Sequence, residues 1–264
     1  HDPEPRVAKA SGVFTQTLYN FGQAWKDKTF RHYSLFVAGM QCMVAISAPF
    51  FAVYMLEGLH FTYFEFVLSS VASILTQFIT LRFWGRFSDL YGNRLVMIIT
   101  SCLIPSLPLL WLFSENYLYI LAIQAFSGFA WSGFTLSTAN YLYDIRPFRS
   151  DFAIYAALQA ALSAGFVFVG AMVGGSIASY SEVFLVWSGL DTWLSSPIFV
   201  VFIVSTTMRS LVALWFIPRS VEPKIRPRPQ LLTLIFRIRG FNAISGVSLD
   251  WLTVAKKKRD KEKQ

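Results

Sequence analysis

The sequence predicts an all-α integral membrane protein with six transmembrane helices. Three observations lead to this fold class: six long apolar stretches, a charged fraction of only 14% in 264 residues, and basic residues that gather on alternate connections. Soluble domains carry about 25% charged residues, so the composition argues against a water-soluble enzyme. A hydrophobic content of 55% also excludes a disordered chain.

Each apolar stretch is long enough to cross a bilayer, because a hydrocarbon core roughly 30 Å thick needs about 20 mostly apolar helical residues. Tyr or Trp stands near several ends of these stretches, as is typical of membrane interfaces. Six buried helices of a soluble protein would leave almost no polar surface, which disfavours that alternative. The predicted spans are residues 33–56, 66–84, 95–113, 118–143, 152–180 and 197–218.

The basic residues predict the orientation. Five precede the first span, three lie at the connection between the second and third, two between the fourth and fifth, and twelve follow the sixth. The other three connections carry only acidic charges. By the positive-inside rule, both termini are expected to be cytoplasmic, with residues 1–32 as a lead-in and residues 219–264 as a basic tail. The net charge of +8 then marks one face of a membrane and requires no nucleic acid.

Arg209 is the one basic residue inside a span. A central Arg costs about 2.5–3.5 kcal/mol on insertion scales, so we expect it to face protein and bond to a carbonyl or hydroxyl of a neighbouring helix. Cys42 and Cys102 are expected to be small buried apolar residues. The three histidines have no metal-ligand spacing, and no metal site is predicted.

One connection carries a motif. Residues 85–94, between the second and third spans, run Gly-Arg-Phe-Ser-Asp-Leu-Tyr-Gly-Asn-Arg and are expected to form a reversing loop. Gly85 permits close helix approach and Gly92 permits a positive φ. Asp89 is the only acid, between Arg86 and Arg94, and can accept from a helix N-terminus or pair with Arg. These residues predict a gating cluster that holds one conformation closed.

This segment resembles the signature loop of the major facilitator superfamily, roughly Gly-x-Leu-Ala/Ser-Asp-x-x-Gly-Arg/Asn-Arg/Lys. Phe87 replaces the usual Leu, and Leu90 stands where a basic residue is common. The resemblance implies one half of a twelve-helix fold and a secondary active transporter that moves a small organic solute by alternating access. The matching positions are Gly85, Ser88, Asp89, Gly92, Asn93 and Arg94.

Other stretches resemble the C-terminal half of bacterial members of this superfamily, among them residues 30–56 and 128–147. The resemblance therefore implies that an N-terminal six-helix half is missing from the chain, and it implies a bacterial inner (plasma) membrane. Two alternatives stay open. One is a complete six-helix protein that dimerises. The other is a non-transporting member of the same fold, such as an assembly factor, a receptor or a lipid-handling protein.

The resemblance further implies that the first, second, fourth and fifth spans line a cavity near the bilayer midplane. An amide inside a membrane needs a partner, either a neighbouring helix or a ligand. No Asp or Glu lies at the middle of a span, so no proton-coupling carboxylate is predicted. The candidate cavity residues are Gln41, Gln77, Gln124, Trp131, Gln159 and Tyr54.

A charge cluster is expected at the cytoplasmic face, where Asp144 pairs with Arg146 and Asp151 caps the fifth span. The sequence has no converging nucleophile and base, no nucleotide-binding loop and no metal-ligand cluster, so neither an enzymatic activity nor a cofactor is predicted. The expected partners are the lipid bilayer, a small-molecule substrate and the missing N-terminal six-helix half.

Overall fold

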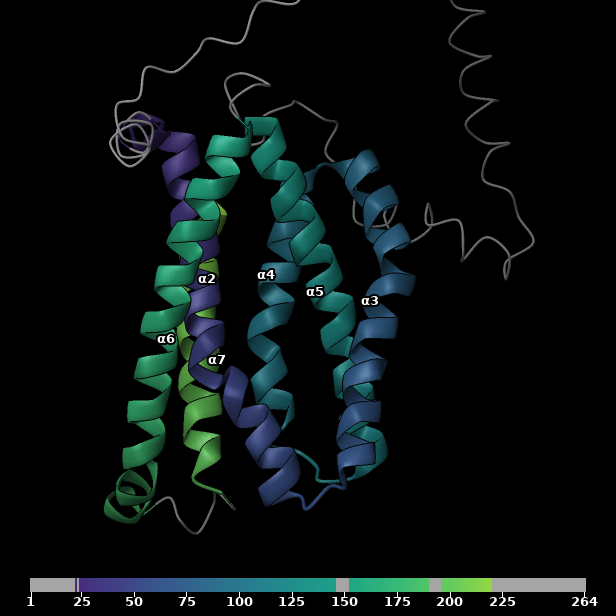
Figure 1. The fold of residues 1–264 in the computed structure, drawn as a ribbon, viewed down its shortest axis with the longest axis vertical. Helices are drawn as coiled ribbons and strands as arrows, with labels where there is room; N and C mark the ends of the chain where they lie inside the picture. The colour runs from purple at the N-terminus through teal and green to yellow at the C-terminus, as the bar shows by residue number, and fades with distance from the viewer. Residues whose placement is uncertain (1–21, 23, 146–151, 190–195, 220–264) are drawn as a thin grey trace, which may run out of the picture. The chain divides into compact units, whose positions relative to one another are not determined.

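The computed structural model describes residues 22, 24–145, 152–189 and 196–219, and within these ranges it has six long helices and no strand. The all-α fold with six helices long and apolar enough to cross a membrane is confirmed (Figure 1). The helices are α2 (Lys28–Val53, continued by the π-helical segment η1, Tyr54–Gly58), α3 (Tyr63–Tyr91), α4 (Asn93–Leu110), α5 (Tyr117–Ile145), α6 (Phe152–Ser188) and α7 (Ile198–Phe216, continued by the 3-10 turn η4, Ile217–Arg219).

Local capping explains why some helices begin earlier than the hydropathy pattern predicts. Helix α2 starts inside the predicted lead-in because the Asp27 carboxylate accepts from the backbone N–H groups of Thr29, at 2.8 Å, and Phe30, at 3.3 Å. Helix α3 starts with a capping box, in which Thr62 and Glu65 satisfy each other's backbone N–H groups. The rest of the predicted lead-in and almost all of the predicted tail lie outside the described residues.

The prediction that residues 85–94 form a reversing loop is wrong, because almost all of them are helical. Residues 85–91 continue α3 to Tyr91, and α4 begins at Asn93, so Gly92 alone connects the two helices. Gly92 has φ 94° and ψ 153°, which confirms the positive-φ turn, and its N–H donates to the Ser88 carbonyl at 2.8 Å. A single residue that avoids the Cβ penalty is enough to reverse the chain, so no longer loop is needed.

Glycines bring two pairs of helices into close contact. A Cβ added at Gly170 or Gly174 of α6 would collide with the backbone carbonyls of Cys42 and Ile46 on α2. A Cβ added at Gly128 of α5 would collide with the Ser73 carbonyl on α3. The α2–α6 and α3–α5 pairs therefore pack backbone against backbone, which is the common use of small residues inside membranes. Helix α4 packs on α5 and α7, and α7 also packs on α2.

The helices run alternately up and down, and this order sorts the charged side chains (Figure 1). The starts of α2, α4 and α6 lie at the same end as the last turns of α3, α5 and α7. We call this the basic end, because apart from Arg209 every described Lys and Arg is there. The opposite end has acidic residues instead. The basic end has Lys26, Lys28, Arg31, Arg82, Arg86, Arg94 and Arg219, and the acidic end has Glu57, Glu65, Glu115 and Glu182.

Candidate functional site

A hydrogen-bonded cluster joins three helices at the basic end. The Ser88 hydroxyl, on the last turn of α3, donates to the side-chain oxygen of Asn93, the first residue of α4. The Asn93 amide nitrogen donates to the carboxylate of Asp144, near the end of α5, at 2.8 Å. Ser88 and Asn93 are buried and Asp144 is half-buried. We call Ser88, Asn93 and Asp144 the turn cluster. It ties the α3–α4 turn to α5.

The side chains that are buried in the turn cluster are not those of the predicted gating cluster. Asp89 and Arg86 lie on the exposed surface of the last turns of α3, and Arg94 is half-buried on α4. A Cβ added at Gly85 would make only an ordinary contact, 3.9 Å from Leu136, so close helix approach does not explain this glycine. Gly92 is the glycine that the backbone requires.

Sequence reasoning placed Asn93 in the motif but did not predict that it links α4 to α5. The predicted partner of Asp144 was Arg146, which lies outside the described residues, as does Asp151 with its predicted cap. The sequence does contain a pattern that could have indicated this link. A side-chain amide next to a positive-φ glycine stands at the start of a helix, where a short polar side chain can reach a neighbouring helix end.

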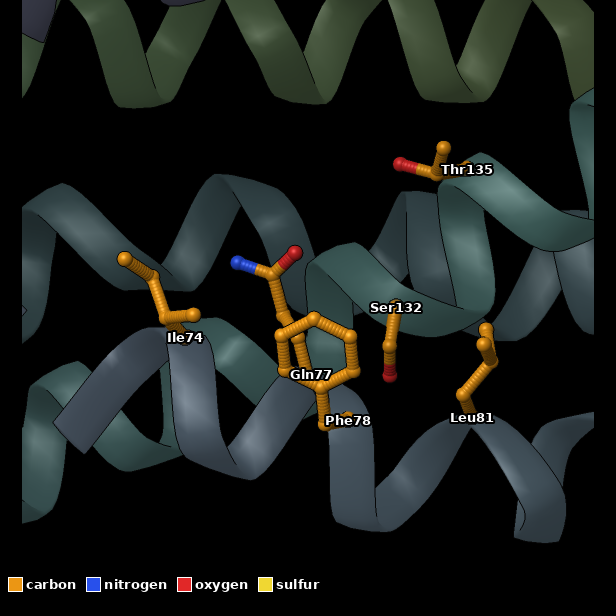
Figure 2. A pocket seen from close by; sticks show the side chains of 6 residues that line it. All are labelled: Ile74, Gln77, Phe78, Leu81, Ser132 and Thr135. Carbon is orange, nitrogen blue, oxygen red and sulfur yellow. The ribbon is translucent and has the colours of Figure 1, made fainter. Parts of the chain in front are cut away.

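Of the candidate cavity residues, Gln77 lines a cavity of about 280 Å³ between α3 and α5. Figure 2 shows its amide extended away from the α3 backbone, with the lining side chains supplied by these two helices. The described polar lining consists of Gln77, Ser132 and Thr135, and none of the described lining residues is charged. Ser132 shares a hydrogen bond of 2.8 Å with Thr80 of α3. The apolar lining residues are Ile74, Phe78 and Leu81.

The candidate cavity residues are spread along the depth of the bundle. Gln41, Gln77 and Trp131 lie about 13–14 residues from the basic end of their helices, roughly 20 Å at 1.5 Å per residue. Gln124 is nearer the acidic end. Trp131 packs edge-on against Phe134, with ring centroids 5.7 Å apart.

Two candidates have local structural roles. Gln159 is near the basic end, is buried, and its amide nitrogen donates to the Ser163 hydroxyl at 3.0 Å within α6. Tyr54 is 2% exposed at the acidic end, where it packs among Trp111, Phe199 and Phe202. The structure therefore does not bring all six candidates into one cavity.

Arg209 bridges three helices. Arg209 is 2% exposed, and its guanidinium donates to the Ser47 hydroxyl of α2 at 2.6 Å. It also donates to the carbonyls of Val44 on α2 and Ile104 on α4, both at 3.4 Å. The Ser205 hydroxyl donates to Ser47 at 3.1 Å. The expectation that Arg209 bonds to an interhelical carbonyl or hydroxyl is confirmed. Its Nε has no hydrogen-bond partner among the residues that the structure describes.

The cysteine prediction is half right. Cys42 is buried against α6, whereas Cys102 is exposed on the outer face of α4, and both are free thiols. An apolar span predicts burial in lipid or in protein equally well, so the sequence cannot separate these two environments. In the described part of the chain, His, Cys, Asp and Glu side chains do not gather in groups of three that could hold a metal ion.

These features define a polytopic helical membrane protein whose second and third spans are joined by a one-residue turn bonded to the fourth. A comparison with sequence families matches residues 33–256 to the Major Facilitator Superfamily. The chain belongs to this superfamily. A comparison with curated proteins finds no match.

Proposed function

We propose that this protein is a secondary active transporter that moves a small organic solute by alternating access. The observation that carries the proposal is the turn cluster in a member of this superfamily. The cluster connects the α3–α4 turn to α5 through polar side chains that can separate and rejoin when helices tilt. It would hold the basic end closed, and breaking the bond between Asn93 and Asp144 would allow α5 to part from the α3–α4 turn there.

The solute would enter beside Gln77. The cavity that Gln77 lines has one amide and two hydroxyl groups among apolar side chains, which suits an amphipathic organic solute better than a bare ion. The lining includes no described carboxylate, so the proposal places the coupling group, if there is one, elsewhere. The proposal assigns no enzymatic activity and no cofactor to these helices.

A second six-helix unit would complete the transporter. Helices α3 and α6 expose large apolar side chains along much of their length, among them Phe78 at 73% and Phe168 at 66%. Lipid or a second unit can cover such faces. We propose that this chain acts as the C-terminal half, with the basic end in the cytoplasm of a bacterial cell and the spans in its inner membrane. Native mass spectrometry of the complete gene product tests this, because a lone six-span unit would overturn it.

The alternative is a non-transporting member of the same fold. The limited polar lining of the Gln77 cavity favours it, since few groups converge there to select a solute. The two functions differ in one observable property. A transporter exposes the cavity to each side of the membrane in turn, and an assembly factor or receptor does not need to.

Cysteine accessibility tests the proposal without a known substrate. Thr135, which is exposed and lines the cavity, is changed to Cys in a background with Cys42→Ala and Cys102→Ser. The complete gene product is placed in right-side-out and inside-out vesicles and treated with a charged, membrane-impermeant thiosulfonate. Alternating access predicts reaction from both sides. Reaction from one side only, or from neither, would overturn the proposal.

Two variants sharpen this experiment. Asn93→Leu removes both turn-cluster bonds, so it should raise the Thr135→Cys reaction rate from the basic end and lower it from the acidic end. Leu211→Cys is the matched control, because Leu211 lies on the outer face of α7 at 54% exposure and should react from neither side. Equal rates with and without Asn93→Leu would show that the turn cluster does not gate the cavity.

A further inference from the structure

A second cavity, of about 260 Å³, lies at the basic end between α2, α5 and α7. It is distinct from the Gln77 cavity and from the turn cluster, and no role proposed above uses it. Its rim has three basic side chains, Lys28 and His32 from α2 and Arg219 after α7. Its floor has three aromatic side chains, Tyr33, Tyr141 and Phe216, each buried.

The aromatic floor is held firmly in place. The Tyr33 ring stacks on Tyr141 with centroids 5.4 Å apart, and its hydroxyl donates to the Thr138 carbonyl at 2.8 Å. The Phe216 ring stacks on Phe36 at 3.7 Å. These contacts fix the floor through α2, α5 and α7, so the cavity does not depend on a mobile side chain for its shape.

The basic side chains of the rim have few hydrogen-bond partners among the described residues. One terminal nitrogen of Arg219 donates to the Trp215 carbonyl at 2.9 Å, and its guanidinium carbon lies 5.1 Å from the centre of the Trp215 indole. This contact orients the guanidinium, and no described residue accepts from its other N–H donors, which can bind a ligand. The His32 ring meets Trp215 edge-on, at 6.1 Å. Lys28 is exposed and makes no ion pair with any residue that the structure describes.

The nearby carboxylates accept hydrogen bonds from other groups and do not line the cavity. Asp27 precedes Lys28, but one of its oxygens accepts from the two N–H groups that begin α2. Asp144 is at the same end and accepts from Asn93. None of the described residues that line the cavity is acidic. The site therefore offers positive charge and several hydrogen-bond donors, which is the chemistry that binds phosphate.

The location of the cavity indicates which kind of phosphate-containing molecule it would bind. Lys28 is the first residue of one candidate membrane span and Arg219 is the last residue of another, so the cavity lies at the ends of these helices, where a headgroup layer is expected. Sites that enclose whole drug-sized ligands occupy about 300–1,000 Å³, and this cavity is just below that range. Basic pockets between spans on one side of a membrane bind anionic headgroups.

We propose that this cavity binds the phosphate of an anionic phospholipid headgroup, with Lys28, His32 and Arg219 as its donors and the aromatic floor beneath it. The inference does not depend on whether the protein transports a solute. The same chemistry would also accept a free phosphate ion, so the experiment separates these two sources.

The test measures lipid binding to the complete, purified protein. Phosphatidylglycerol is titrated into delipidated protein in detergent, and bound lipids are counted by native mass spectrometry. The double variant Lys28→Gln/Arg219→Gln should weaken the tightest site at least tenfold. The matched control, Lys26→Gln/Arg82→Gln, removes two exposed charges at the same end that do not line the cavity, and should change binding less than twofold.

Further arms test the remaining outcomes. Lys28→Arg/Arg219→Lys keeps the charges and should retain binding, which would show that positive charge at these two positions is what the lipid requires. Phosphatidylcholine should bind at least tenfold more weakly than phosphatidylglycerol. Inorganic phosphate at millimolar concentration should not displace the lipid. Displacement would assign the cavity to a soluble phosphate instead, and equal loss in both double variants would overturn a specific site altogether.

Discussion

Replacing Arg209 by Met should stabilise the protein, although Arg209 makes three hydrogen bonds. Replacing a buried charged group by an apolar side chain of similar volume is often neutral or stabilising by about 1–4 kcal/mol, because the charge no longer has to be desolvated. In return, an interhelical hydrogen bond inside a membrane contributes about 0.6 kcal/mol on average and at most about 1.7. Only the 2.6 Å bond to Ser47 has short geometry, since the two carbonyl contacts at 3.4 Å are near the limit for a hydrogen bond.

These opposing contributions predict the sign and size of the change in the free energy of unfolding for three variants. Arg209→Met keeps the packing volume and sheds the buried charge, so it should raise the free energy of unfolding by about 1–2 kcal/mol. Arg209→Ala also empties the site, and large-to-small changes in a core cost about 2–5 kcal/mol, so it should be less stable than Arg209→Met by that amount. Ser47→Ala leaves the guanidinium without its best acceptor and should lower stability by about 1–3 kcal/mol.

The assay is reversible unfolding by sodium dodecyl sulfate in mixed micelles, followed by far-ultraviolet circular dichroism. Leu211→Met, on the outer face of the same helix, is the control and should change the free energy by less than about 0.5 kcal/mol. The cycle Arg209→Met, Ser47→Ala and the double variant isolates the pair, with an expected coupling of about 0.6–1.7 kcal/mol. A loss of more than about 1 kcal/mol in Arg209→Met would refute the reasoning, because the buried charge would then be a net stabiliser.

Two glycine substitutions give further predictions in the same unfolding assay. Gly92→Ala forces a side chain into φ 94° and should cost about 1–3 kcal/mol. Gly128→Ala drives a Cβ into the Ser73 carbonyl and must separate α3 from α5, so it should cost at least about 1–3 kcal/mol and loosen that helix pair. Gly165→Ala, with open space around it and an ordinary helical backbone, is the control for both and should be neutral or stabilising by up to about 1 kcal/mol. Similar costs at all three positions would contradict the steric argument.

The six-helix architecture could be predicted from the amino-acid sequence, and the reason is physical. In lipid every backbone N–H and C=O must form its hydrogen bond within the span, so an apolar stretch of sufficient length forms a helix. The same holds for the sorting of charges, because alternate helix ends meet at the same face. It also holds for Gly92, where a helix had to reverse and only glycine avoids strain.

The neighbours of each side chain required the three-dimensional structure. Lipid is as apolar as a protein core, so a membrane helix has no polar stripe to mark its outer face. Nothing along α3 therefore distinguishes Trp84, which is buried against α5, from Phe78, which is exposed beside the Gln77 cavity.

For the same reason the hydropathy pattern could not show that α3 continues to Tyr91, that Asp144 bonds to Asn93, or that Lys28 and Arg219 border one cavity. These features depend on how the helices end, how they are rotated about their axes and how they are paired. That arrangement follows from close packing at Gly128, Gly170 and Gly174, and hydrophobicity does not specify it.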